Sequence, residues 1–181
     1  MTARLASLVA LLVTLAAVAA GCGSSQSAEE KWANDVCGQV TTWKDSVTKA
    51  TDDIRSQLKS PSSASVDAIK SDVTSISDAT TKLSSDLKSI GAPNTPAGSQ
   101  AKQQVDTFAT QLNNTVQQAK QTTGSLSSSA GITEIISKLS SLGPSLQALG
   151  SSAQTTLKSV QSSAKALKDG FQKASACKPY R

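Results

Sequence analysis

Apolar residues recur every three or four positions along most of this chain, and that spacing constrains the fold more than any other feature. Four such runs cover residues 32–58, 66–90, 97–119 and 146–174. Residues at this spacing fall on one face of an α-helix, and they form the stripe that a helix buries against its neighbours. No segment shows sustained alternation of apolar and polar residues. We therefore expect an all-α fold without strands.

The breaks between these runs carry the residues that end and start helices. Residues 60–63 contain a proline, and residues 124–131 are rich in serine and glycine. Residues 91–96 place Thr95 where it can cap a helix N-terminus, with Pro96 at the first helical position. These connections are short, and short connections favour antiparallel neighbours.

The segment before the last run predicts one additional short helix. Residues 132–142 have helical spacing, and Gly143 and Pro144 are expected to interrupt the helix there. The expected fold is an elongated up-and-down antiparallel bundle of four long helices plus one short helix. Its helix interfaces are rich in alanine, valine and threonine, which lets helices approach closely and leaves little room for an interior pocket.

Charged residues support the helical interpretation. Acid-first pairs at i,i+4 spacing favour helices. They are Asp45–Lys49, Asp78–Lys82, Glu134–Lys138 and Asp169–Lys173.

The first 22 residues form a leader of three parts. A short segment with Arg4 precedes an uncharged apolar run over residues 5–18, and Ala19-Ala20-Gly21 leads into Cys22. The apolar run has about 14 residues, too few for a membrane span of roughly 20. It resembles the signal peptide and lipobox of bacterial lipoproteins, although Ala19 stands where leucine is favoured. The alternative is an ordinary secretory signal that happens to end near a cysteine.

The lipoprotein resemblance implies that the leader is removed and that Cys22 is diacylated. Two acyl chains suffice for stable membrane anchoring. We then expect residues 1–21 as signal peptide, 22–28 as lipidated cysteine and flexible tether, and 29–181 as the helical domain. The tether reaches at most about 20 Å, so the domain would lie near the extracytoplasmic face of the cell membrane.

Two cysteines remain once Cys22 is lipidated. An even remainder in an exported chain predicts a disulfide between Cys37 and Cys177. The alternatives are two buried thiols or a redox pair, although the wide separation lacks the activation of a CxxC motif. The bond requires the start of the first helix and the end of the last helix to lie at the same end of the bundle, as an even number of long helices allows.

Composition argues against catalysis and against nucleic-acid binding. The chain has no histidine, the commonest general base and neutral metal ligand. No nucleophile motif, phosphate-binding loop or metal-ligand cluster appears, so we expect no enzyme activity, no cofactor and no metal. The net charge is +5, but the lysines are spread along every segment and form no nucleic-acid-binding stripe.

Three local features have a functional and a structural interpretation. Trp32 and Trp43 share a helix face and form either a ligand-contacting ledge or part of the core. Asp52-Asp53 point about 100° apart on a helix and therefore form no paired carboxylate. Lys178 and Arg181 either contact anionic lipid headgroups or simply complement a helix C-terminus.

The lipobox, the polar tether, the Trp32–Cys37 start and the C-terminal cysteine together resemble small uncharacterised helical lipoproteins of high-GC Gram-positive bacteria. That resemblance implies a location and a fold but no activity. We expect a lipid-anchored, extracytoplasmic protein that binds or scaffolds an envelope protein or surface partner. The alternative is a carrier or sensor accessory for a small ligand or lipid.

Overall fold

The computed structural model describes residues 26–59, 63–125 and 132–181, and this part of the chain is all-α. No strand occurs within these ranges. The helices are α1 (Ala28–Lys59), α2 (Ser63–Ser89), α3 (Pro96–Gly124), α4 (Ile132–Ser162), α5 (Lys165–Lys173) and the 3-10 helix η1 (Ser175–Tyr180). The leader and Cys22 lie outside the described residues.

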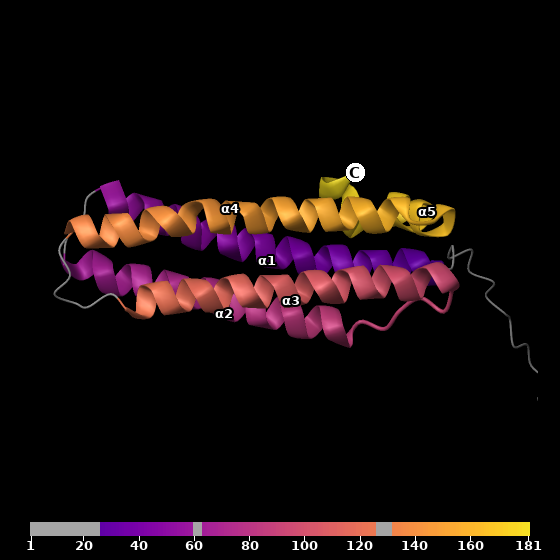
Figure 1. The fold of residues 1–181 in the computed structure, drawn as a ribbon. Coiled ribbons are helices and arrows are strands. Elements are labelled where there is room, and N and C mark those ends of the chain that lie inside the picture. The colour runs from indigo at the N-terminus through magenta and orange to yellow at the C-terminus, as the bar shows by residue number, and fades with distance from the viewer. Residues whose placement is uncertain (1–25, 60–62, 126–131) are drawn as a thin grey trace, which may run out of the picture.

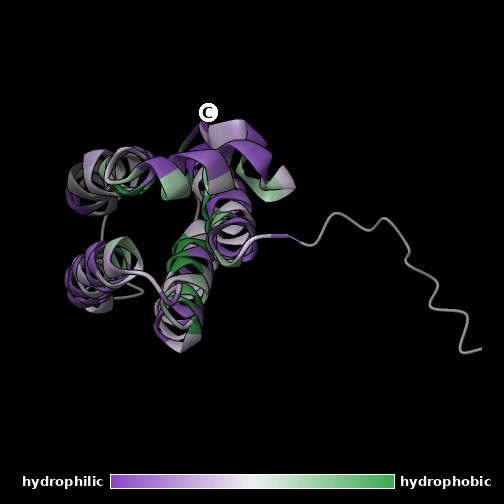
Figure 2. Cartoon of the chain, turned by 90° about the vertical axis from the view of Figure 1, so that its right-hand side faces the viewer, coloured by the Kyte–Doolittle hydropathy of each residue, from purple (hydrophilic) through white to green (hydrophobic). Residues whose placement is uncertain are grey.

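The long helices lie side by side as an elongated bundle (Figure 1). The α1–α2 and α3–α4 connections lie at one end, and the α2–α3 connection and α5 lie at the other. Helix α1 packs against α2, α4, α5 and η1. An end-on view shows hydrophobic residues concentrated in the column of helices around α1 (Figure 2).

The core is built from the apolar stripes that the sequence predicts. Its large members with less than 2 % exposure include Ile69, Ile76, Leu83, Leu112 and Leu167. Helix α2 also buries hydroxyls at Ser77, Thr80 and Ser84. Small side chains at such positions let the helix backbones approach closely.

Trp43 explains why a threonine is buried in the α2 stripe. The indole Nε1–H of Trp43 donates to Thr80 Oγ1 over 3.0 Å, and the Thr80 hydroxyl donates to the Ile76 carbonyl over 2.7 Å. Both polar groups are thereby satisfied in the core, as buried polar groups generally are. The indole also packs edge-on against Phe108 of α3, with ring centroids 6.5 Å apart.

The connection between α2 and α3 has the predicted cap. Thr95 has an extended backbone, and its side chain accepts a hydrogen bond from the Gly98 N–H at 3.1 Å. Pro96 is the first residue of α3. Gly98 is buried against Pro93, where an added Cβ would collide with the Pro93 backbone. A glycine is therefore required for this loop to close over the helix.

The predicted interruption at Gly143 and Pro144 is wrong. Helix α4 runs continuously from Ile132 to Ser162 with Pro144 inside it. A proline inside a helix removes one backbone hydrogen bond and bends the helix without always ending it. Pro144 itself is exposed on the surface of α4.

The last long run is instead broken near its C-terminal end. Ala164 has an extended backbone, with φ −157° and ψ 151°, and it separates α4 from α5. The Ser163 backbone N–H and hydroxyl both donate to the Val160 carbonyl at the end of α4, over 3.2 and 2.7 Å. The apolar spacing continues through Ala164 to Leu167, so the stripe gives no sign of this break.

The exposed ion pairs mostly have the opposite orientation from the one expected. Glu134–Lys138 forms as predicted, at 3.1 Å. The other three predicted pairs are replaced by different ones: Lys49 contacts Asp53, Lys82 contacts Asp86, and Asp169 contacts Lys165. Acid-first and base-first pairs at i,i+4 spacing both place the two charges on one helix face. Exposed ion pairs contribute little free energy in either order, so the preference for acid-first pairs is too small to decide which pair forms.

Thr80 provides a direct test of the buried hydrogen bond. We expect Thr80→Val to lower the free energy of unfolding by about 1–3 kcal/mol, because the Trp43 N–H would remain buried without an acceptor. Chemical denaturation followed by circular dichroism measures this loss. Thr74→Val is the matched control, since the exposed Thr74 hydroxyl makes only the same i−4 bond to the Lys70 carbonyl. Equal effects of the two variants would contradict a stabilising role for the Trp43–Thr80 bond.

Candidate functional site

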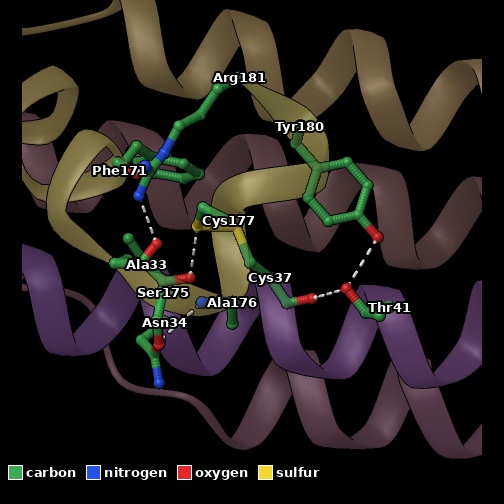
Figure 3. The surroundings of a disulfide bond; sticks show 11 residues. Ala33, Asn34, Cys37, Thr41, Phe171, Ser175, Ala176, Cys177, Tyr180 and Arg181 are labelled. Atoms are coloured by element: carbon green, nitrogen blue, oxygen red, sulfur yellow. Dashed lines mark hydrogen bonds between the residues drawn. A yellow bond between two sulfur atoms is a disulfide. The ribbon is translucent and has the colours of Figure 1, made fainter.

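The predicted disulfide between Cys37 and Cys177 is present, and it joins η1 to the first third of α1. The two Cα atoms lie 5.1 Å apart, across a sequence separation of 140 residues. Both cysteines are buried. The start of α1 and α5 therefore lie at the same end of the bundle, as the cysteine pairing required (Figure 1), and η1 brings Cys177 against Cys37 (Figure 3).

Asn34 on α1 holds the start of η1, just before Cys177. Its Oδ1 accepts hydrogen bonds from the Ala176 N–H at 3.1 Å and from the Ser175 hydroxyl at 3.2 Å. Asn34 lies one turn before Cys37, so the two residues hold η1 from the same face of α1 (Figure 3). This hydrogen-bonding role of Asn34 was not predicted from the sequence.

Two further side chains hold the end of η1. The Arg181 guanidinium donates to the carbonyls of Phe171 and Ala174, at 3.2 and 2.7 Å. The Tyr180 and Thr41 hydroxyls lie 3.1 Å apart and share a hydrogen bond. Burial raises the pKa of Tyr180 above its ordinary value, so this hydroxyl stays protonated at neutral pH.

Helix α5 packs closely against the start of α1. Trp32 meets Phe171 edge-on, with ring centroids 6.1 Å apart. Gly170 faces the backbone of Glu29, and an added Cβ would lie 2.8 Å from the Glu29 carbonyl carbon. No larger residue fits at Gly170 without a shift of one helix against the other.

Trp32 and Trp43 belong to the core and form no exposed ledge. Their exposed fractions are 4 % and 3 %. The structural interpretation of this pair is therefore confirmed. The Trp32 Nε1 is buried without a hydrogen-bond partner in the described part of the chain.

A pocket of about 220 Å³ lies where η1 meets α1 and α4. Its walls include Val40, Trp43, Lys44, Gly150, Gln154 and Tyr180. From the small side chains at the helix interfaces we expected little room for an interior pocket. The pocket forms because η1 folds back over the bundle. The apolar periodicity of the four runs does not predict this position of η1.

A larger open groove of about 580 Å³ lies between α3 and α4. Uncharged polar residues dominate its lining, including Gln100, Gln103, Gln104, Gln111, Thr155 and Ser159. Phe108 also contributes to the lining. The Gln104 Oε1 atom is buried and accepts no hydrogen bond from the residues that the structure describes. The groove thus offers amide and hydroxyl groups without a charge.

The two basic residues considered for membrane contact have different surroundings. Arg181 uses its guanidinium in the hydrogen bonds to α5 described above. Lys178 is exposed on η1, which packs along α1. Contact of either residue with lipid remains a prediction.

Asp52 and Asp53 do not act as a paired carboxylate, because each has its own basic partner. Asp52 pairs with Arg55 at 3.2 Å, and Asp53 pairs with Lys49 at 2.7 Å. No group of three or more potential metal ligands occurs among the described residues. None of the described helices is both long enough and apolar enough to cross a bilayer.

Comparison of this chain with protein-family profiles, curated proteins and solved structures finds no match.

Gly170 tests how closely α5 must approach α1. We expect Gly170→Ala to lower the free energy of unfolding by about 1–3 kcal/mol, because the new methyl group would overlap the Glu29 backbone. Thermal unfolding of the disulfide-bonded protein measures the change. Gly38→Ala is the matched control: its Cβ would enter open space, so a gain of about 0.5–1 kcal/mol is expected from helix propensity. Stabilisation by both substitutions would contradict the close packing.

Proposed function

We propose that this protein is a lipid-anchored helical bundle on the extracytoplasmic face of the cell membrane, with a non-enzymatic binding or scaffolding role. The support for the anchor is the Ala19–Cys22 sequence, which resembles a lipobox. Helix α1 begins at Ala28. The intervening chain spans at most about 20 Å, so the start of α1, α5 and η1 would lie nearest the membrane.

The architecture we propose for this role is an up-and-down bundle of four long helices, α1 to α4, with α5 as the one short α-helix. The disulfide would close the membrane-proximal end. Helices of 27 to 32 residues extend about 40–48 Å at 1.5 Å per residue. The bundle would then project its α1–α2 and α3–α4 connections away from the membrane.

The main support for a binding role is the groove between α3 and α4. Glutamine and threonine side chains from two helices converge there without a charged group among the groove residues named above. Amides and hydroxyls both donate and accept hydrogen bonds. The buried acceptor Gln104 Oε1 lacks a partner, and a bound surface could supply the donor. Such a groove suits an uncharged polar surface of an envelope partner better than a nucleic acid.

A carrier or sensor role for a small ligand is the second candidate. The support for it is the 220 Å³ pocket between α1, α4 and η1. This pocket is separate from the α3–α4 groove, so the two roles can be tested with different substitutions.

The anchor is tested by Cys22→Ala. We expect the unmodified protein to incorporate an alkyne-labelled fatty acid in its host and to fractionate with membranes. Cys22→Ala should lose the label and leave the membrane fraction, because the thiol that carries the lipid is gone. Ser24→Ala, two residues away, is the matched control and should behave as the unmodified protein does. A fatty-acid label on Cys22→Ala equal to that on the unmodified protein would contradict the anchor, whichever fraction the variant is found in, because an unprocessed variant keeps its apolar leader.

The groove is tested by placing a photo-crosslinking amino acid at single glutamines of α3 in intact cells. Gln103 and Gln111 line the groove, so we expect each to give a discrete crosslinked species. Gln117 is exposed on α3 outside the groove, and it should give none. Immunoblotting of the crosslinked envelope measures the pattern. Equal crosslinking at all three positions would contradict a specific role for the groove.

A further inference from the structure

Helix α3 carries a row of uncharged polar side chains along its outer face. The row consists of the exposed residues Gln100, Gln103, Thr107, Gln111, Asn114, Gln118 and Gln121. Successive members are three or four residues apart, so they share one face of the helix over about 32 Å. We call this row the amide seam. Its first four members line the α3–α4 groove, and the other three extend it toward the C-terminal end of α3.

The charged residues of α3 lie away from the amide seam. Lys102 and Lys120 are each nine residues from Gln111 in the sequence, which places them about 180° from it around the helix. Asp106 is the third charged residue of α3, and it pairs with Lys102. The amide seam therefore has no charge of its own.

The exposed faces of α1 and α2 differ from the amide seam because they carry charges along their length. Their exposed lysines include Lys31, Lys44 and Lys49 on α1, and Lys82 and Lys88 on α2. The chain has a net charge of +5, so two copies repel each other at long range. The amide seam is a face on which two copies can meet without like charges opposite each other.

The amide groups of the seam can bond to their own copies. A glutamine or asparagine side chain both donates and accepts hydrogen bonds, so the same residue from two copies can form a complementary pair. Two lysines can only donate, and two carboxylates can only accept. A face made of amides is thus suited to an interface in which each copy presents the same surface.

We propose that the amide seam pairs with the amide seam of a second copy of this chain, with the two α3 helices parallel across a two-fold axis. In that arrangement residues near the axis meet their own copies. This inference rests on the proposed function, because it names the partner of the α3–α4 groove. The parallel orientation follows from anchoring both copies in one membrane.

The size of the seam limits how tightly two copies can bind. A helix face about 32 Å long and 10–12 Å wide covers about 350 Å² per copy, whereas a standard specific interface buries about 800 Å² per partner. Pairing in dilute solution should therefore be weak. Confinement to one membrane surface raises the local concentration of the seam, as tethering does, so we expect the pairs to form on the membrane.

Cysteine crosslinking of the full-length protein in the membranes of its host tests the pairing. The native disulfide and the proposed lipid occupy the three cysteines of the chain. With a short bismaleimide, Gln100→Cys, Gln111→Cys and Gln118→Cys should each give a product of twice the mass of one chain. Thr48→Cys, exposed on α1, is the matched control and should give at least about tenfold less product, because α1 lies outside the seam.

Charge substitutions distinguish pairing of two copies from binding of another protein. Gln111→Lys should lower crosslinking through Gln118→Cys at least about tenfold, because like charges would face each other across the axis. Gln111→Glu should have the same effect. Co-expression of the two charge variants should restore the product, because opposite charges would then face each other. Gln111 is exposed, so circular dichroism should show unchanged helix content in both variants.

Three results would overturn the proposal. They are equal product from the Thr48→Cys control, product from Gln111→Cys alone, which would indicate an antiparallel pair, and no recovery on co-expression. A crosslink from the groove to a protein of another mass, with no product of twice the chain mass, would also overturn it and would leave the binding role of the groove in place. Loss of every crosslink from the groove would contradict both.

Discussion

The bond between Cys37 and Cys177 is the constraint on which the rest of this structure depends. It joins the start of α1 to the end of the described chain across 140 residues. In the chain-entropy treatment a loop of that length stabilises the folded state by about 5 kcal/mol. The bond also has a local consequence, because it places η1 against α1 and brings Tyr180 to the pocket. One covalent link thus closes the bundle and builds part of a candidate binding site.

The sequence predicts the helical runs, the cap at the start of α3 and the disulfide, because each depends on local spacing or on cysteine count. Thr95 and Pro96 specify the start of α3 through their own backbone preferences. The break at Ala164 could not be predicted, since it depends on how α5 packs on α1. Gly170 carries a signal of that packing, but it is interpretable only once Glu29 is known to lie beside it. The α1–α4–η1 pocket was missed for the same reason.

The proposed membrane anchor and the proposed partner-binding groove lie toward the same end of the bundle. The anchor would hold the start of α1 near the membrane, and the disulfide holds η1 at the same end. The α3–α4 groove begins near Gln100, in the first turns of α3, and therefore lies toward that end as well. A partner bound there would sit close to the membrane surface. In this proposal the helices would fix the position of the groove, and its uncharged side chains would make the contacts.

Hydrogen–deuterium exchange of the oxidised and the reduced protein tests most directly whether the disulfide holds this end together. If the account is correct, reduction will speed exchange in α5, in η1 and in the first turns of α1. The middle of α2 and α3, which packs through the apolar core and the Trp43–Thr80 hydrogen bond, will still exchange more slowly than α5 and η1 in the reduced protein. Identical exchange of α5 and η1 in the two forms would contradict the account, because it would show that the packing contacts alone hold η1 in place.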